Sequence, residues 1–256
     1  MKSIRILVVT HKKYDMPNDK QLYLPIQSGS AIHEDLGIQR DDEGDNISDK
    51  NLLYNELCPM YCAWKNLDSD YIGMVHYRRH FSKNSKNLRS YEDILTYEEA
   101  NKLTDKYDII LPHKKKYLFS TVKKHYQHCK AGYEEIHTND LKVLRNVICN
   151  LRPEYVTAFD KVMNGNSAHM LHICLMRRDR YDEYCNFVFP VMKECELLLR
   201  DRPDALRFIG ALSEFLMDVW LETNNYKYYE LGLVELEKQN IVKRVIAVCK
   251  RKYFNR

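Results

Sequence analysis

Short apolar runs mark the predicted strands of this chain. The segment "IRILVVTH" (4–11) is almost continuously apolar and ends in polar residues, which is typical of a strand buried on both faces. The segments "YIGMVHY" (71–77) and "YDIILP" (107–112) share this character, and "AHMLHICLM" (168–176) predicts a fourth strand. The apolar runs therefore predict a buried sheet whose first strand lies at the start of the sequence.

Apolar positions at helical spacing begin after the first polar stretch. A helix is predicted after Ser48 or Asp49, either of which can cap it, and Pro59 indicates a kink or a late start. The predicted apolar face of this helix consists of Leu53, Leu57, Met60, Tyr61 and Trp64.

Later segments continue the helical pattern. Residues 90–104 predict a helix or a turn followed by a helix, and helical patterns also cover 120–163, 181–199 and 211–224. Residues 12–51 instead are rich in Pro, Gly, Asp and Asn and predict a long loop of the kind that carries binding residues. Early strands and late helices predict an α/β fold: a central mixed sheet flanked by helices, with a helix-rich C-terminal half.

Composition narrows the class of protein. The 256 residues predict one domain, taken as 1–238, followed by a basic tail, 239–256. A net charge of +4 is too small to favour a nucleic-acid partner. Eight cysteines without a CxxC pair indicate reduced thiols packed as small hydrophobic groups, and not a zinc or disulfide framework. No signal peptide or membrane span is evident, so we expect a cytoplasmic protein that can lie at the inner face of the membrane.

Charged residues crowd the end of the second predicted strand. In "DYIGMVHYRRHF" (70–81) the apolar run ends in His76, Arg78 and Arg79. Ligands of open α/β sheets lie beyond the carboxyl ends of strands, and guanidinium groups match phosphate oxygens, so the two arginines predict a diphosphate site. Ion pairs with neighbouring carboxylates explain them equally well.

Two further groups are candidate donor-binding residues. Thr10 and His11 close the first strand at the same predicted edge, where they could contact a nucleobase or ribose; an ordinary polar strand end is an equal alternative. The "EGDNISDKN" loop concentrates groups that can bind sugar hydroxyls, although a helix-capping turn explains Ser48 or Asp49. These groups are Asp45, Asn46, Ser48, Asp49 and Asn51.

Four segments together resemble one protein family. They are "VTHKKYDMP", "LPIQSGSA", "GDNISDKNLLYNELCPMYCAWKNLDSDYIGMVHYRRHF" and "RFIGALSEFLMDVW". The chain resembles the bacterial capsular and exopolysaccharide glycosyltransferases long catalogued as a domain of unknown function, some of which are galactofuranosyltransferases. The resemblance implies a GT-A-like fold, a nucleotide-diphosphate sugar donor, which we take to be UDP-linked, and a lipid-linked or oligosaccharide acceptor in capsule, exopolysaccharide or O-antigen synthesis.

The family resemblance also implies roles for single residues. GT-A folds usually hold a divalent metal with a DxD motif, and "HYRR" stands in its place here. We therefore expect Arg78 and Arg79 to neutralise the diphosphate without an obligatory cofactor, although His76 could instead help to bind Mn²⁺ or Mg²⁺. Glu214, expected at a helix start, is the candidate base of an inverting transfer; a carboxylate complementing the helix dipole is the alternative. Asp218, one turn later, is the second choice and is expected to face solvent.

The chain departs from the family pattern in two places. "ELCPMYCAWKN" replaces the usual "ELTALYWAWKN", and "HMLHICLMRRD" replaces a strand that usually begins "NMFIMKK". The second segment is expected to face the acceptor, which makes His169 and Met170 candidate acceptor-binding residues.

A module that binds nucleotide sugars or glycans without catalysis is the alternative function.

The last residues are both basic and apolar. The segment "QNIVKRVIAVCKRKYFNR" (239–256) predicts an amphipathic helix that can lie on an anionic membrane surface. A terminal helix docked on the domain is the alternative.

Overall fold

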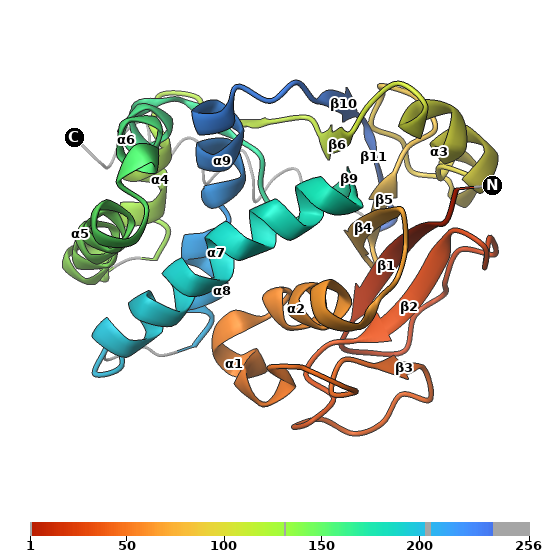
Figure 1. Ribbon diagram of the computed structural model, residues 1–256, viewed down its shortest axis with the longest axis horizontal. Coiled ribbons are helices and arrows are strands. Elements are labelled where there is room, and N and C mark those ends of the chain that lie inside the picture. Colours follow the sequence, from red (N-terminus) through yellow and green to blue (C-terminus); the bar gives the residue numbers. More distant parts are fainter. Residues whose placement is uncertain (1, 131, 203–205, 238–256) are drawn as a thin grey trace.

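The computed structural model describes residues 2–130, 132–202 and 206–237. Its main sheet has the strand order β10-β6-β9-β4-β1-β2-β3 (Figure 1). Two short strands, β5 and β11, extend it beside β4. These strands are β1 (Ile4–Thr10), β2 (Tyr23–Gln27), β3 (Gln39–Arg40), β4 (Tyr71–His76), β5 (Arg79–Phe81), β6 (Ile109–Pro112), β9 (Cys174–Arg177), β10 (Tyr229–Leu231) and β11 (Leu233–Glu235).

The sheet is mixed because one central strand runs against its neighbours. β1 is parallel to both β2 and β4, and β6 is parallel to β10. β9 lies between β4 and β6 and is antiparallel to both. The carboxyl ends of β1 and β4 therefore meet at one edge, as the sequence predicts for His11 and His76.

Helices bury both faces of the sheet. On β1, Leu7 and Val9 belong to the larger apolar core, while Ile4, Ile6 and Val8 belong to the smaller one. The larger core contains α1 (Asn51–Tyr54), α2 (Leu57–Asn66) and α7 (Arg178–Leu198), and α3 (Tyr97–Thr104) packs against the smaller core. The prediction of a first strand buried on both faces is confirmed.

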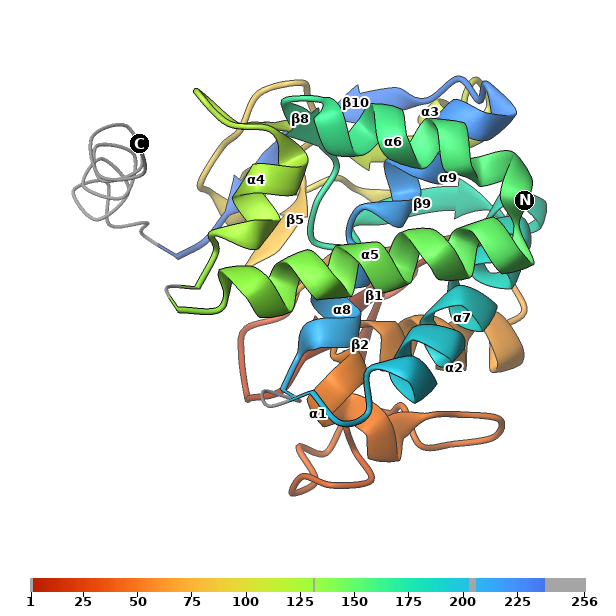
Figure 2. The same cartoon turned by 90° about the vertical axis from the view of Figure 1, so that its left-hand side faces the viewer.

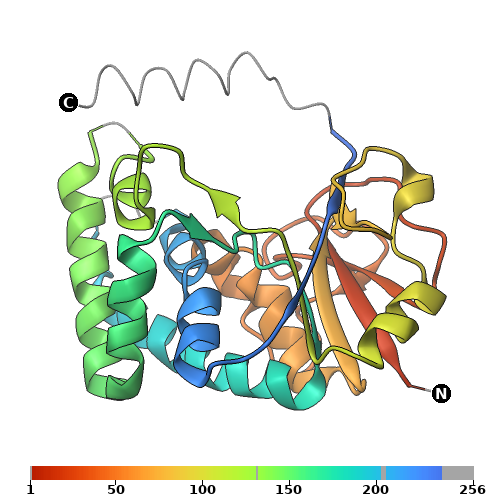
Figure 3. The same cartoon turned by 90° about the horizontal axis from the view of Figure 1, so that it is seen from above.

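The C-terminal half adds a group of helices beside the sheet. Figures 2 and 3 show α4 (Val122–Gln127), α5 (Glu134–Leu151) and α6 (Val156–Asn164) standing to one side of the strands. α8 (Phe208–Ser213) and α9 (Leu216–Asn224) lie between this group and the sheet. A small antiparallel sheet of β7 (Lys115–Lys116) and β8 (Ser167–Ala168), strands that are distant in the chain, joins the two parts. Short 3-10 turns, 48–50, 91–93 and 153–155, complete the structure.

Three element predictions are wrong in detail. The strand predicted over 168–176 is two strands, β8 and β9, separated by an irregular turn. The helix predicted over 211–224 is broken between α8 and α9, so Glu214 lies at the break and not at a helix start. The loop predicted over 12–51 contains β2, which pairs with β1 along its whole length.

Helix α2 shows how Pro59 is accommodated. A positive φ of 49° at Asn55 ends α1, and α2 then begins at Leu57. Pro59 consequently falls in the first turn, where its missing N–H costs no helical hydrogen bond. The late start is confirmed, but Ser48 does not cap the helix, because its buried hydroxyl donates to Asp41.

Several predictions concern cysteines and the membrane. Within the described residues the cysteines form no disulfide; Cys129 and Cys149 are exposed, whereas the other five are buried. No helix in the described ranges is long and apolar enough to cross a membrane. The predicted basic tail, 239–256, and the domain boundary at 238 lie outside the described residues.

Candidate functional site

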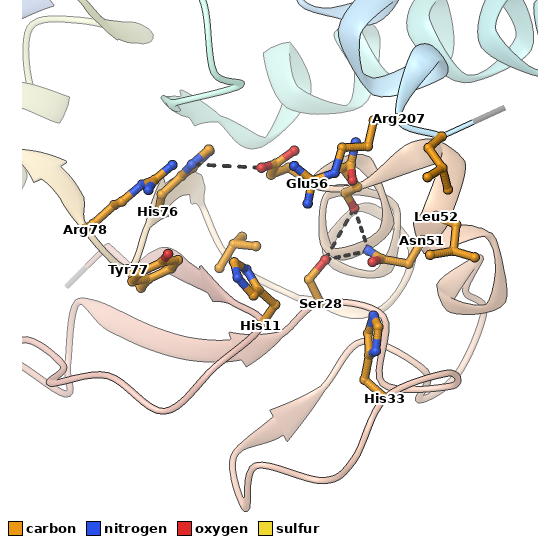
Figure 4. Close-up of a pocket in the computed structure, with 13 residues that line it drawn as sticks. His11, Ser28, His33, Asn51, Leu52, Glu56, His76, Tyr77, Arg78 and Arg207 are labelled. Atoms are coloured by element: carbon orange, nitrogen blue, oxygen red, sulfur yellow. Dashed lines mark hydrogen bonds and ion pairs between the residues drawn. The ribbon is translucent and has the colours of Figure 1, made fainter. Parts of the chain in front are cut away.

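A cavity of about 420 Å³ opens at the carboxyl ends of β1 and β4. Figure 4 shows its lining side chains, which come from the end of β1, the loop after β2, the α1–α2 junction, the β4–β5 turn and the segment before α8. They are Val9, His11, Ser28, His33, Asn51, Leu52, Asn55, Glu56, His76, Tyr77, Arg78, Leu206 and Arg207. This edge of a parallel sheet is where α/β proteins bind ligands.

A carboxylate and an imidazole face each other in the cavity. Nδ1 of His76 lies 4.0 Å from Oε1 of Glu56, and Figure 4 shows the carboxylate pointing to the ring. Nε2 of His76 donates to the carbonyl of Leu171 at 2.7 Å, which leaves Nδ1 to face Glu56. Burial lowers the pKa of His76. Burial opposes ionisation of Glu56, yet His76 and backbone hydrogen bonds hold its pKa below the usual range.

The turn between β8 and β9 is strained where it meets this pair. Leu171 and His172 have φ angles of 78° and 54°, which side chains with a Cβ rarely adopt. The carbonyl of Leu171 accepts from His76, and its backbone also hydrogen-bonds to Glu214. The buried ring of His172 lies 3.1 Å from the hydroxyl of Ser213. Strained backbone of this kind persists where it positions functional groups.

Glu214 lies at the break between α8 and α9 and is not among the residues that line the cavity. Burial and the charge of Glu56 raise its pKa to about 7, while Lys115 and the hydrogen bond from Leu171 oppose the rise. Glu56 and Glu214 are thus two neighbouring carboxyls whose pKa values are pushed apart. Such a pair can keep one group ionised while the other exchanges a proton near neutral pH.

The sequence "HYRR" forms a tight hairpin turn. His76 pairs with Arg79 across the turn, which leaves Tyr77 and Arg78 at its tip and in the cavity lining. The alternative of ion pairs is seen for both arginines, with Arg78 at 3.0 Å from Glu237 and Arg79 at 3.7 Å from Glu235, and their contact with a diphosphate stays a prediction. The Nε of Arg78 is nevertheless buried without a hydrogen-bond partner among the described residues. A buried donor of this kind can serve a ligand oxygen.

The polar loop before α1 holds its own neighbours in place. Asp41, which is fully buried, accepts from the backbone of Gly29 and Ser30 and from the hydroxyl of Ser48. Asn46 hydrogen-bonds within the loop, and Asp45 accepts from Tyr61 at the surface. The structure therefore gives Asp45, Asn46 and Ser48 structural contacts outside the cavity lining, and their contact with a donor stays a prediction.

Asn51 is the member of this loop that reaches the cavity. Its side-chain amide donates to the hydroxyl of Ser28 at 2.7 Å and to the carbonyl of Asn55 at 3.0 Å (Figure 4). Gly29 has φ 73°, and a Cβ there would approach the Asn51 side chain to 2.6 Å. The loop after β2 is thus packed directly on the helix that carries Asn51.

The end of β1 supplies an aromatic wall. The ring of His11 meets Tyr77 edge to face at 5.5 Å, and Tyr14 packs on the other side of Tyr77 at 4.8 Å. Partial burial and the charge of Lys12 lower the pKa of His11, which favours its neutral form. Thr10 is buried and its hydroxyl donates to the carbonyl of Lys12, so it shapes the strand end.

The chain matches a family along most of its length. Residues 5–225 match the family described as a domain of unknown function, DUF4422. This chain belongs to the DUF4422 family. The family resemblance predicted from the sequence is thereby confirmed.

The solved structures give one strong similarity for this DUF4422 chain. The apo structure of WbbM, described as a bifunctional glycosyltransferase, is 26% identical, with a TM-score of 0.82 over 92% of this chain. This chain covers 46% of that chain, so it spans less than half of its length. The predicted GT-A-like α/β fold is confirmed. No curated protein matches this sequence.

The residues predicted to meet an acceptor lie in a second polar cluster of the DUF4422 chain. His169 is 3% exposed; Nδ1 is 2.9 Å from Asp218 and Nε2 is 3.2 Å from Glu230. Nζ of Lys114 lies 2.8 Å from Asp218. Both ring nitrogens of His169 are thus engaged, and Met170 packs on the larger core, so acceptor contact by these two residues stays a prediction.

Asp218 corrects an expectation, because it is 4% exposed and does not face solvent. Burial opposes its ionisation, but His169 and Lys114 hold its pKa below the usual range.

Asp218→Ala should therefore lower the free energy of unfolding by about 3–5 kcal/mol, since it removes the carboxylate that Lys114 and His169 share. Urea denaturation measures this change.

Asp160→Ala is the matched control for this prediction. Asp160 also pairs with a cation, Arg145, but both side chains are 44% exposed. Its loss should leave the denaturation midpoint nearly unchanged because solvent screens an exposed pair. If the Asp218 and Asp160 variants had equal denaturation midpoints, the buried cluster would contribute no more to the free energy of unfolding than the exposed ion pair does.

Several residues that line the cavity were not predicted from the sequence. Among them, Glu56, Asn55 and Arg207 lie outside the ends of the strands. Glu56 could have been found, because "NE" precedes the Pro-containing helix start. Arg207 could not, since it reaches the cavity only through its left-handed backbone, φ 62°, and the bond from its N–H to the carbonyl of Leu52.

The donor atoms of the cavity limit how a metal could bind. Within the described ranges, no three His, Cys, Asp or Glu side chains gather into a metal-binding group. Glu56 and His76 would supply two ligands, so a Mn²⁺ or Mg²⁺ ion would need further ligands from the donor or water. Whether the activity depends on a metal stays a prediction.

Proposed function

We propose that this DUF4422 chain transfers a sugar from a UDP-linked donor to a glycan acceptor in the synthesis of bacterial surface polysaccharide. The observation that carries the proposal is the set of charged groups at one cavity: Arg78, Arg207 and Glu56 line it, and a second carboxyl, Glu214, is near enough to Glu56 that the pKa values of the two are pushed apart. The similarity to WbbM, a glycosyltransferase, supports the same reaction class.

Glycosyl transfer needs stabilisation of the leaving diphosphate. Negative charge develops on this group as its bond to the anomeric carbon breaks. Arg78 and Arg207 both line the cavity, and Arg79 lies close enough to perturb the ionisation of His76 and Glu214. We assign these arginines to the diphosphate, and the aromatic wall of His11 and Tyr77 to the nucleoside.

The acceptor hydroxyl must lose a proton as it attacks. A base is most effective when its pKa lies near the working pH, and the pKa of Glu214 is about 7. We assign Glu214 as that base in a single inverting displacement. The ionised carboxylate of Glu56 lies nearer the cavity, where it can stabilise the positive charge that develops on the sugar ring.

The finer assignments extend the family resemblance. We propose a hexose, with galactofuranose as the first donor sugar to test, and a lipid-linked oligosaccharide as the acceptor. The second candidate function is binding without catalysis. It is favoured by the carboxylates that already pair with Arg78 and Arg79.

Thermal unfolding against nucleotides tests the proposal. UDP at a hundredfold excess over its dissociation constant should stabilise the fold by about 2.7 kcal/mol, which raises the Tm by about 5–10 °C. Other nucleoside diphosphates serve as controls, each with EDTA or with Mn²⁺. A shift that survives EDTA supports neutralisation by arginine, and a shift that requires Mn²⁺ makes Glu56 and His76 metal ligands.

Two results separate the alternatives. Hydrolysis or transfer of a UDP-sugar supports an enzyme, whereas a UDP shift without turnover of any UDP-hexose supports the binding module. Folded protein whose Tm responds to no nucleotide would contradict the transferase and a module that binds nucleotide sugars, and would leave a module that binds glycans.

A further inference from the structure

Two large apolar side chains project together from the surface. Leu118 and Phe119 are 68% and 78% exposed and occupy the connection between β7 and α4. Figure 2 shows this connection extending outward before it enters α4. We call residues Leu118–Ser120 the tip. Exposure of one apolar residue is common, but two adjacent ones at a projecting turn indicate a contact surface.

The backbone on both sides of the tip is fixed. Tyr117 N–H donates to the carbonyl of Asn166 at 2.7 Å, and Val122 N–H donates to that of Gly165 at 2.9 Å. The side chains of Tyr117 and Val122 are buried, whereas those of Leu118 and Phe119 at the tip are exposed. The fixed residues on either side therefore hold the tip in its projecting position. Binding of a partner then removes little conformational entropy from the backbone of the tip.

Exposed lysines flank the apolar tip along the chain. Lys115 and Lys116 precede it on β7, and Lys123 and Lys124 follow it on α4; all four are exposed. No carboxylate of the described residues forms an ion pair with Lys116 or Lys124. A projecting apolar pair with exposed lysines on both sides of it along the chain is complementary to a surface that has negative charge outside and hydrocarbon beneath, which is an anionic lipid bilayer.

The base of the tip adjoins the candidate site. Lys115 is close enough to Glu214 to lower its pKa. β8 pairs with β7 and leads directly into the turn of His169 and Leu171. A surface that holds the tip would thus hold the turn of His169 and Leu171, part of the segment predicted to face the acceptor, near it.

We propose that the tip and its four lysines dock on the surface of an anionic bilayer, with Leu118 and Phe119 inserted at the boundary between headgroups and acyl chains. The site would thereby meet an acceptor whose lipid lies in the same bilayer. This last consequence rests on the proposed function, whereas the docking itself does not.

Binding to vesicles measures the docking on the full chain. The protein should cosediment with vesicles of phosphatidylglycerol and phosphatidylethanolamine, and less with phosphatidylcholine. The double variant Leu118→Ser/Phe119→Ser should bind at least about tenfold more weakly because its apolar insertion is lost. Lys116→Ala/Lys124→Ala should lose about fivefold for each lysine and depend less on salt.

Leu197→Ser/Leu198→Ser is the matched control, because these adjacent leucines at the end of α7 are 54% and 58% exposed. It should bind vesicles like the unaltered protein. The Tm of each variant shows that it is folded. The UDP-induced shift should be the same in all of them, so failure of the nucleotide proposal and failure of the docking proposal are distinguishable.

Fluorescence quenching locates the contact. Phe119→Trp should be quenched by vesicles with brominated acyl chains, while Leu198→Trp should respond like the unaltered protein. Equal quenching of the two tryptophan variants, or unchanged binding by Leu118→Ser/Phe119→Ser, would overturn the proposal and leave residues 239–256 as the membrane-binding segment. Self-association that the double variant abolishes, without binding to vesicles, would overturn it in favour of a contact between two copies.

Discussion

Replacing Glu214 by glutamine is expected to lower the kcat of sugar transfer by about 10²–10⁴-fold and to leave the UDP-induced shift in Tm unchanged. Glutamine keeps the size of the side chain and can accept the hydrogen bond from Leu171, but it cannot take a proton. Steady-state kinetics with a UDP-sugar and an acceptor measure the effect. Glu222→Gln is the control, because Glu222 lies on α9 in an exposed ion pair with Lys161.

The pH dependence of the same enzyme gives an independent reading of Glu214. Activity should rise with pH through about 7, because the base must be ionised to accept a proton. Stability should change in the opposite direction. A folded-state pKa above the unfolded value contributes stability that is full below the unfolded pKa and is lost as pH rises through about 7.

Glu214→Gln should consequently gain stability relative to the unaltered protein at alkaline pH, and this difference should disappear in acid. An unchanged kcat together with an unchanged pH profile would transfer the role of base to another group. Glu56 is then the next carboxylate to test, since it lines the cavity itself.

Arg78→Ala is expected to remove the UDP-induced shift in Tm and to lower kcat/KM by about 10²–10³-fold. The side chain lies in the cavity lining with an unpaired, buried Nε. Its ion pair with Glu237 is about 40% exposed on both sides, so solvent screens it and a diphosphate with two negative charges can displace it. Calorimetric titration with UDP measures the affinity directly.

Glu237, the carboxylate that pairs with Arg78, provides a control whose substitution should change the affinity for UDP in the opposite direction. Glu237→Gln should strengthen UDP binding, because it removes the carboxylate that competes for Arg78. Arg145→Ala removes an arginine from a surface pair with Asp160 and should change neither affinity nor rate. UDP binding that is as tight in Arg78→Ala as in the unaltered protein would contradict the role of this guanidinium.

Local pattern predicted the strands well and the helix breaks poorly. The three early apolar runs became β1, β4 and β6 with shifts of one or two residues, because burial on both faces leaves a continuous apolar signal. The break at Glu214 was missed, since the apolar spacing of 211–224 continues through it. At this break the Glu214 carboxylate accepts a hydrogen bond from the backbone of Leu171, a tertiary contact that local spacing does not encode.

The candidate site was predicted in part for a similar reason. His11, His76 and Arg78 stand at strand ends, and the rule that ligands bind at carboxyl ends placed them together. The polar loop was predicted to bind the sugar, but most of its side chains hold neighbouring residues. The same amides and carboxylates serve either role, so the sequence pattern does not separate the two. Asp41 shows the difference: its partners, Gly29 and Ser30, lie on another element.

The central place of β9 determines the order in which the chain can fold. β4 ends at His76, but the strand that covers its free edge begins only at Cys174. During synthesis, β1, β2 and β4 can pair early, while the apolar edge of β4 stays open until the whole helical segment between α4 and α6 has emerged. An open apolar edge is a template for pairing with other chains. The nascent protein is therefore most prone to aggregate before residue 177 leaves the ribosome, and insertion of β9 closes that period.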